Sequence, residues 1–338
     1  MATRDASPLV LTMGEPAGIG PEITLRAWAT AKEENLPPFL VAGDPALYRR
    51  LAGQLGLRLE VAEIKTPADA LACFSDALPV LPVTLSEEVR PGELSPANAK
   101  AVMDAINLAA QLCISGQAGG MVTNPIHKRA LYDAGLSVPG HTEYLADLCG
   151  GTTPVMMLSC FDLRVVPVTV HLPLQKVVGQ LTRETIIEQG QILAAALQTD
   201  FSIPHPRIAV AALNPHAGEE GRLGREEIDI IAPAIKALSD NNTGATFTGP
   251  HPADTLFHAA ARKNYDAVLC MYHDQALIPL KTIDFENGVN TTLGLPIVRT
   301  SPDHGTALDI AGKGMAHPGS LIAAIRAAGD MAACRARQ

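Results

Sequence analysis

The sequence of 338 residues lacks the paired cysteines that a thiolate metal centre or a disulfide-stabilised domain requires. Its six cysteines are far apart, and no two of them form a C-x-x-C pair. This spacing argues against both kinds of structure. We interpret most of the cysteines as small, buried apolar residues.

The sequence also lacks long apolar runs, since none reaches the roughly 18 residues that a membrane helix needs. Its first ten residues, MATRDASPLV, have no charged start, apolar centre and small-residue cleavage site of the kind found in signal peptides. We therefore expect a cytoplasmic protein that does not interact with membranes.

Positive charge is scarce as well. The formal net charge is -9 and the pI is about 5.6, which argues against nucleic acid as a partner. An acidic protein that binds a phosphate must gather positive charge locally. Lysine, arginine and histidine side chains that converge on one place are therefore informative in this chain.

No standard dinucleotide fingerprint is present. The glycine-rich stretch GEPAGIGPE (14–22) follows the first expected strand, but Glu15 and Pro16 break the G-x-G-x-x-G pattern. The stretch also lacks the G-K-[ST] of a P-loop. Its two prolines indicate a rigid turn, and the sequence alone assigns no residue to a nucleotide.

What is present is the composition and pattern of a globular α/β protein. The chain is 47% hydrophobic and 18% charged, and its length suits two fused lobes. Strand-like runs at 9–13 and 39–44 alternate with helix-like runs, as in a mostly parallel sheet. We predict two α/β lobes with mixed, mostly parallel sheets and helices on both faces. Residues 1–130 plus 304–338 are assigned to the first lobe and 131–303 to the second.

Several further elements are expected. Ser95 followed by proline predicts a capped helix start, and 155–170 predicts an antiparallel strand pair. Helices are also predicted at 182–198, 224–238 and 252–263.

Three histidines come at the ends of strand-like runs: His171 in VVPVTVHLP, His216 in AVAALNPHAG and His273 in LCMYHDQ. The ends of parallel strands meet at one edge of a sheet, so these side chains can converge. Three imidazoles with an open fourth position suit a catalytic divalent metal. The alternative is that each is an ordinary hydrogen-bonded histidine. Asp254 and Asp274 are candidates to orient a ligand or bind substrate, or else they are helix caps.

A helix start in GHTEYL (140–145) offers donors for an anion. Free N–H groups at a helix N-terminus attract negative charge, and His141 and Thr142 would add side-chain donors. The alternative is a plain cap by Thr142. The turn TNPIHK presents His127 and Lys128 either near the same site or to solvent.

An amine, an amide and a guanidinium follow His273 along the chain: Lys281, Asn290 and Arg299. Together they suit a carboxylate or a phosphate. The alternative is ordinary surface polarity. The apolar context TLGLPIVRTSP indicates that Arg299 is half-buried and therefore paired.

At these residues the sequence resembles the 4-hydroxythreonine-4-phosphate dehydrogenases of vitamin B6 biosynthesis. The resemblance covers essentially the whole chain in order. It implies a two-lobed α/β fold similar to the isocitrate and isopropylmalate dehydrogenases, and a homodimer with the active site at the subunit interface. The stretches that carry it are LTMGEPAGIGPE, TNPIHK, GHTEYLA, VHLPL, LNPHAGEEG, HPADTLF, MYHDQALIPLK and GVNTTLGLPIVRTSPDHGTALDIAG.

The resemblance also implies ligands. A divalent metal (zinc, magnesium or cobalt) would be held by three histidines drawn from both subunits, which correspond to His171, His216 and His273. NAD or NADP would lie in the cleft, with DHGTA (303–307) as a contact. No general base is assigned. The family's substrate contacts fall on His141, Thr142, Lys281, Asn290 and Arg299.

The implied reaction is oxidation of 4-phosphooxy-L-threonine to 2-amino-3-oxo-4-phosphooxybutanoate, which decarboxylates to 3-amino-2-oxopropyl phosphate. The stretch TIDFENG departs from the form in enteric members and is expected to affect substrate choice. Relatives that oxidise phosphorylated threonate or erythronate, or a ring dihydrodiol, leave those substrates open. The alternatives from other classes are a metal-dependent lyase without a nicotinamide and a non-catalytic metabolite-binding protein.

Overall fold

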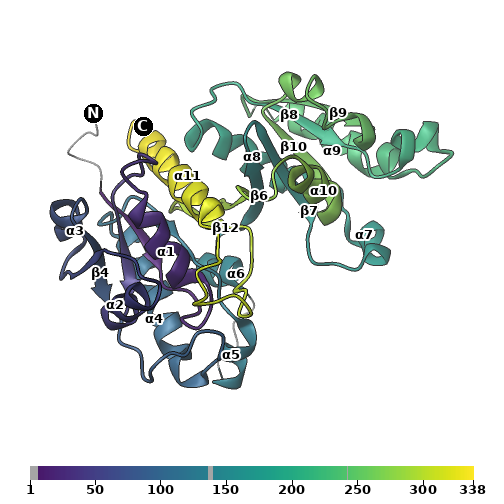
Figure 1. Ribbon diagram of the computed structural model, residues 1–338. Helices are drawn as coiled ribbons and strands as arrows, with labels where there is room; N and C mark the ends of the chain where they lie inside the picture. The colour runs from purple at the N-terminus through teal and green to yellow at the C-terminus, as the bar shows by residue number, and fades with distance from the viewer. Residues whose placement is uncertain (1–6, 136–139, 242) are drawn as a thin grey trace. The chain divides into compact units, whose positions relative to one another are not determined.

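The chain forms two compact units in a computed structural model that describes residues 7–135, 140–241 and 243–338 (Figure 1). Unit 1 comprises Met1–Pro154 and Leu295–Ala336. Unit 2 comprises Val155–Gly294, together with the last two residues. Each unit is described on its own below.

Unit 1 contains a parallel sheet with the strand order β3-β4-β2-β1-β5-β12. Its central strands are buried on both faces, which explains why LVLT and FLVAG are continuous apolar runs rather than alternating ones. The bounds are β1 (Leu9–Thr12), β2 (Phe39–Gly43), β3 (Glu60–Glu63), β4 (Ala77–Pro82), β5 (Met121–Val122) and β12 (Arg299–Pro302).

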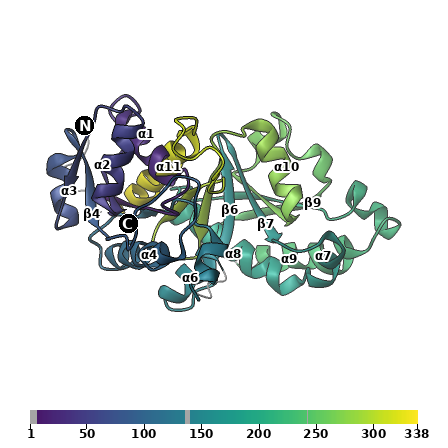
Figure 2. The same ribbon diagram turned by 60° about the horizontal axis from the view of Figure 1, so that its bottom comes forward.

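Helices cover both faces of this sheet. Figure 2 shows α1, α2 and α11 on one face and α4 on the other. The short helices α5 and α6 contact α4, and β12 pairs with β5. Residues 131–135, 140–154 and 295–303 therefore group with unit 1 rather than with the second lobe. The bounds are α1 (Gly20–Ala29), α2 (Pro45–Gln54), α3 (Pro67–Cys73), η1 (Pro96–Asn98), α4 (Ala99–Ile114), α5 (Lys128–Asp133), α6 (His141–Leu148) and α11 (Gly319–Arg335).

The predicted helix start at Ser95 is confirmed, but the predicted capping bond from its side chain is wrong. The chain enters α4 through the short turn η1, and Ser95 makes no capping hydrogen bond there. Its hydroxyl instead donates to the Glu87 carboxylate at 3.0 Å. The Ser95 side chain therefore bonds to Glu87 and not to the N–H groups at the start of the helix.

A buried carboxylate ties α1 to a segment almost 300 residues away. Glu22 is fully buried and accepts hydrogen bonds from the backbone N–H groups of Gly312 (3.0 Å) and Ala316 (3.3 Å). It also pairs with Arg26 at 3.3 Å, and Arg26 donates to the Gly314 carbonyl at 2.7 Å. The pair therefore fixes the 312–316 segment against the first helix.

Replacing Glu22 with alanine should lower the free energy of unfolding by about 3 kcal/mol, because two buried N–H groups and a cation lose their acceptor. Urea titration followed by circular dichroism measures the change. Glu33→Ala, at an exposed carboxylate just after the same helix, is the matched control. Equal urea midpoints for the two variants would show that Glu22 does not hold the 312–316 segment.

Unit 2 contains a mixed sheet with the strand order β11-β6-β7-β10-β8-β9. The antiparallel pair predicted within 155–170 is present, because β6 and β7 pair in that sense, and β11 is antiparallel to β6. The neighbours β7, β10, β8 and β9 are parallel. The bounds are β6 (Val155–Cys160), β7 (Leu163–Thr169), β8 (Arg207–Ala211), β9 (Thr246–His251), β10 (Ala267–Tyr272) and β11 (Val289–Leu293).

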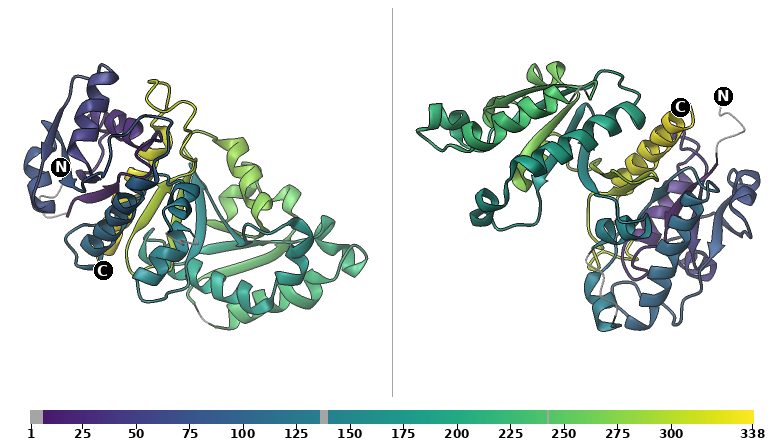
Figure 3. Two further views of the ribbon diagram at one scale, coloured as in Figure 1. Left: turned by 90° about the horizontal axis from the view of Figure 1, so that it is seen from below. Right: turned by 180° about the vertical axis from the view of Figure 1, so that it is seen from behind.

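Helices α8 and α9 lie on one face of this sheet and α10 on the other (Figure 3). No helix among the described residues combines the length and apolar character needed to cross a bilayer. All six cysteines are free thiols, with Cys160, Cys270 and Cys334 buried and the rest half-buried. The bounds are α7 (Leu174–Gln180), α8 (Arg183–Thr199), η2 (Pro215–Gly221), η3 (Glu227–Ile231), α9 (Ala232–Asp240), η4 (Ala253–Thr255), η5 (Ala261–Asn264) and α10 (His273–Ile283).

The helix predicted at 252–263 is wrong. Its residues form only the short turns η4 and η5, and the segment before them is the unpredicted strand β9. Pairing with β8 fixes β9 in an extended conformation, and Pro252 follows it directly. Asp254 therefore caps no α-helix.

Candidate metal and anion site

The three strand-end histidines lie at one edge of the unit 2 sheet. His171 follows β7, His273 follows β10 directly, and His216 follows β8. Strand β10 is hydrogen-bonded in parallel to both of the others. The carboxyl ends of these neighbouring strands therefore point the same way, although His216 lies several residues beyond its strand, in the turn η2.

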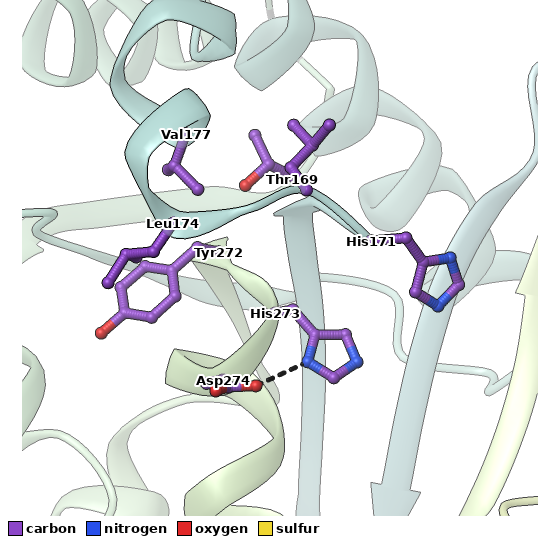
Figure 4. Close-up of a pocket in the computed structure, with 8 residues that line it drawn as sticks. Thr169, His171, Leu174, Val177, Tyr272, His273 and Asp274 are labelled. Carbon is purple, nitrogen blue, oxygen red and sulfur yellow. Dashed lines mark hydrogen bonds and ion pairs between the residues drawn. The ribbon is translucent and has the colours of Figure 1, made fainter.

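Two of these imidazoles are brought together within one chain. The ring centroids of His171 and His273 are 5.9 Å apart, and both rings line a pocket of about 240 Å³ (Figure 4). The His273 Nδ1 atom lies 2.7 Å from Asp274 Oδ1. With Nδ1–H donated to the carboxylate, Nε2 keeps its lone pair, the form in which histidine binds metals. The apolar wall of the pocket comes from Leu172, Leu174 and Val177.

His216 is exposed, and its backbone has a φ of 53° in the turn η2. Among the described residues, no three His, Cys, Asp or Glu side chains gather as a metal centre. Two imidazoles facing one pocket, one of them oriented by a carboxylate, are nevertheless a donor set that fits zinc or a similar divalent metal. One chain thus supplies two of the three predicted ligands at one place. Of the two candidate aspartates, Asp274 accepts the hydrogen bond from His273, and Asp254 lies in the short turn η4.

Arg299 is a buried cation in unit 1. It begins β12, is 3% exposed, and donates from Nε and Nη2 to the Thr123 hydroxyl at 3.2 and 2.7 Å. Burial lowers the pKa of Arg299 to about 10, an effect that the Glu143 carboxylate opposes. The guanidinium is therefore still charged at neutral pH, in a site where an anionic ligand would be strongly favoured.

His141 begins α6 in the same unit. Its Nε2 atom is enclosed and has no hydrogen-bond partner among the described residues. Burial, together with the positive charges of Arg299 and Lys128, lowers the pKa of His141 to about 3. A neutral imidazole near two cations can donate an N–H to a phosphate or carboxylate. Thr142, next in the helix, makes no capping bond, because Gly140 occupies the N-cap position.

This low pKa predicts acid sensitivity. Unfolded His141 takes up a proton near pH 6.5, but the folded group does so only near pH 3. Between these values the unfolded state binds more protons, so stability must fall as the pH falls. Urea midpoints measured at pH 7 and pH 4.5 should show that His141→Asn loses about 2 kcal/mol less than the parent. An identical loss in both proteins would show that His141 is not kept neutral by the fold.

The remaining two predicted anion ligands lie in unit 2. Lys281 lies in the last turn of α10. Its Nζ atom lies 5.2 Å from the centre of the Phe285 ring. Asn290 lies in β11, and its Oδ1 atom is buried without a hydrogen-bond partner among the described residues. An enclosed amide oxygen of this kind is suited to accept a hydrogen bond from a ligand.

Sequence reasoning missed the Thr123 hydroxyl that holds Arg299 and the Glu143 carboxylate that acts on it. Both residues stand in motifs that the sequence singled out, TNPIHK and GHTEYL. The position of Thr123 directly after β5 was the available signal, because polar residues at a strand end face the ligand edge of a parallel sheet.

Fold and site together define a two-unit α/β protein with two paired imidazoles beyond parallel strands of one unit and a buried arginine in the other. More particularly, the chain belongs to the PdxA family, since the family described as "Pyridoxal phosphate biosynthetic protein PdxA" matches residues 34–328.

Individual relatives agree with this family over nearly their full lengths. The chain is 52% identical over 334 residues to a 4-hydroxythreonine-4-phosphate dehydrogenase from Caulobacter vibrioides, covering 97% of this chain and 98% of the relative. It is 51% identical over 331 residues to the protein of that name from Erythrobacter litoralis, with the same coverages. The crystal structure of 4-hydroxythreonine-4-phosphate dehydrogenase from Klebsiella pneumoniae superposes with a TM-score of 0.88 at 39% identity, covering 97% of this chain and all of that one.

Proposed function

We propose that this protein is a metal-dependent dehydrogenase that uses NAD or NADP to oxidise 4-phosphooxy-L-threonine at its secondary hydroxyl. The product, 2-amino-3-oxo-4-phosphooxybutanoate, is a β-keto acid and loses CO₂ to give 3-amino-2-oxopropyl phosphate, a step toward pyridoxal 5'-phosphate. The observation that carries the proposal is the near-complete match to relatives that bear this enzyme's name. The geometry supports it with the two kinds of group that the substrate needs.

The first kind is the histidine set. His171 and His273 would hold a divalent metal such as zinc, magnesium or cobalt, with Asp274 fixing the tautomer of His273. His216 would complete the set from the second subunit of a homodimer. Within one chain, His171 and His273 form the pair to which it would be added. A metal bound there supplies Lewis acidity, which lowers the pKa of a coordinated hydroxyl.

The second kind is the set of anion donors. Arg299 and Lys281 carry positive charge to a substrate that has both a phosphate and a carboxylate. His141, neutral because of its low pKa, and Thr142 would donate hydrogen bonds to these oxygens. Asn290 offers an enclosed acceptor, which suits the substrate's amino group. Such local donors are what a chain of net charge -9 requires to bind an anion.

The nicotinamide would contact the 303–307 loop in unit 1. This loop packs on the glycine-rich turn after β1, where the Ile19 N–H donates to the Thr306 carbonyl at 2.9 Å. A Cβ at Gly18 would lie 2.9 Å from the same carbonyl oxygen, so only glycine fits there. The close packing holds the two loops against each other, so the 303–307 loop would offer the nicotinamide a fixed surface.

A spectrophotometric screen tests the function. The metal-stripped protein is supplied in turn with zinc, magnesium or cobalt, with NAD⁺ or NADP⁺, and with 4-phosphooxythreonine, phosphothreonate or phosphoerythronate. We expect the near-ultraviolet absorbance of reduced nicotinamide to rise with 4-phosphooxythreonine and only when metal is present. If the absorbance rises only with phosphothreonate or only with phosphoerythronate, that acid is the substrate. Consumption of substrate with no absorbance change would indicate a lyase, and binding without consumption would indicate a metabolite-binding protein.

A further inference from the structure

The turn that carries His216 has an unusual backbone. Every residue from His216 to Glu220 has a positive φ, between 43° and 77°, so the chain makes a left-handed helical turn after β8. Only Gly218 among these five adopts that conformation without steric cost. A run of strained residues persists only when surrounding contacts hold it, and such runs cluster at functional sites.

One buried carboxylate holds the start of this turn. Glu227 is 3% exposed, and its Oε1 atom accepts the backbone N–H groups of Leu213 at 2.8 Å and Asn214 at 2.7 Å. Its Oε2 atom accepts the Asn214 side-chain amide at 2.9 Å. Charge-assisted bonds to three donors make this one of the strongest polar anchors available to a loop.

The turn also packs directly on that carboxylate. A Cβ at Gly218 would lie 2.6 Å from Glu227 Oε2, and one at Gly224 would overlap the Asn214 amide. Glu227 itself begins the π-helical turn η3, a geometry that is frequent at functional sites. His216 is exposed, so the backbone of the turn, more than packing of the ring, sets where its imidazole points.

We propose that Glu227 is a positioning residue for the metal, holding the left-handed turn so that His216 is presented as a ligand. The inference rests on the proposed function, because it takes His216 to be a metal ligand. Glu227 acts through the backbone of Leu213 and Asn214 and touches neither substrate nor cofactor. By fixing the turn before metal binds, Glu227 lowers the conformational entropy that the His216 turn would otherwise lose on binding.

The test is metal binding by the Glu227→Gln variant. Glutamine removes the negative charge behind all three hydrogen bonds and places an N–H₂ group against the Asn214 side-chain amide, so the anchor of the turn should weaken. Calorimetric titration of Co²⁺ into the metal-stripped dimer should show affinity reduced about 10- to 100-fold, the usual loss when a supporting group of a metal ligand is removed. Hydrogen exchange of the amides at 213–220 should accelerate. Raising the Co²⁺ concentration should restore turnover, which a general loss of structure would not allow.

Asp229→Asn is the matched control. It makes the same carboxylate-to-amide change within η3, at a side chain that pairs with the exposed Arg225. It should bind Co²⁺ as the parent does. Should Glu227→Gln not fold, Gly218→Ala decides by the same two measurements, since its methyl group would displace the Glu227 carboxylate.

His216→Ala in the same titration separates the two proposals. If His216→Ala binds Co²⁺ as tightly as the parent, the proposed metal site is wrong and the inference falls with it. If His216→Ala binds weakly while Glu227→Gln and Gly218→Ala bind normally, the metal site stands and only the role of Glu227 is overturned.

Discussion

Replacing His216 with alanine should abolish turnover and bring the bound divalent metal to background in the same preparation. Under the proposed function, His216 completes a metal site with His171 and His273, which line one pocket. Metal analysis by mass spectrometry and the nicotinamide absorbance assay give the two readouts, and circular dichroism should match the parent. His205→Ala, at an exposed histidine of the same unit, is the control and should retain both. Full activity without bound metal would refute the metal-dependent mechanism.

The same variant tests the dimer. If His216 and His273 of one site come from different subunits, a mixed dimer of His216→Ala and His273→Ala has one intact site and one doubly damaged site. Random mixing of two inactive proteins should then recover about one quarter of the parent activity. Should all three ligands come from one chain, no mixture would show activity. Co-expression with two purification tags isolates the mixed dimer directly.

Replacing Arg299 with glutamine should lower kcat/KM for the phosphorylated substrate about 10²- to 10³-fold, which corresponds to roughly 3–4 kcal/mol of lost binding in the transition state. The guanidinium is buried and still charged at neutral pH, so its attraction for an anion is little screened. Arg299→Lys should recover only part of the loss, because an ammonium cannot reproduce the planar fork.

Two comparisons sharpen this result. Arg326→Gln, at an exposed arginine of α11 that pairs with Glu34, should leave kcat/KM unchanged. The unphosphorylated analogue separates phosphate from carboxylate recognition, since a smaller loss with the analogue assigns Arg299 to the phosphate. Equal kcat/KM values for Arg299→Gln and the parent would remove Arg299 from the site.

Much of the fold could be predicted because its buried strands are continuous apolar runs. The pairing of His171 with His273 followed from the parallel neighbours β7 and β10, whereas the gathering of all three histidines stays a prediction. Strand β9 could not be predicted, because its sequence TFTGPH mixes glycine and proline and its extended form depends on pairing with β8. Local pattern carries no information about such a partner.

The supporting groups of the site were harder to predict than its ligands. Glu227 reads as one more acidic residue of an expected helix, and its bonds to Leu213 and Asn214 exist only once the turn has folded. Thr123 and Arg299 are likewise brought together by the pairing of β5 with β12, across most of the chain. The assigned lobe boundaries differ from the observed units for the same reason. Strand pairing between distant segments, and not composition, decides where a unit ends.

The discontinuity of unit 1 has a consequence for how the protein is made. Strand β12 and helix α11 come from the last part of the chain, yet β12 hydrogen-bonds to β5 and α11 packs on the same strands. While the ribosome is still synthesising residues beyond 122, the outer edge of β5 has no neighbour and is open to pairing with another nascent chain. A chain that ends before residue 295 should therefore be aggregation-prone and depend on chaperones, even though it contains all of the first helices and Val155–Gly294 of the second unit.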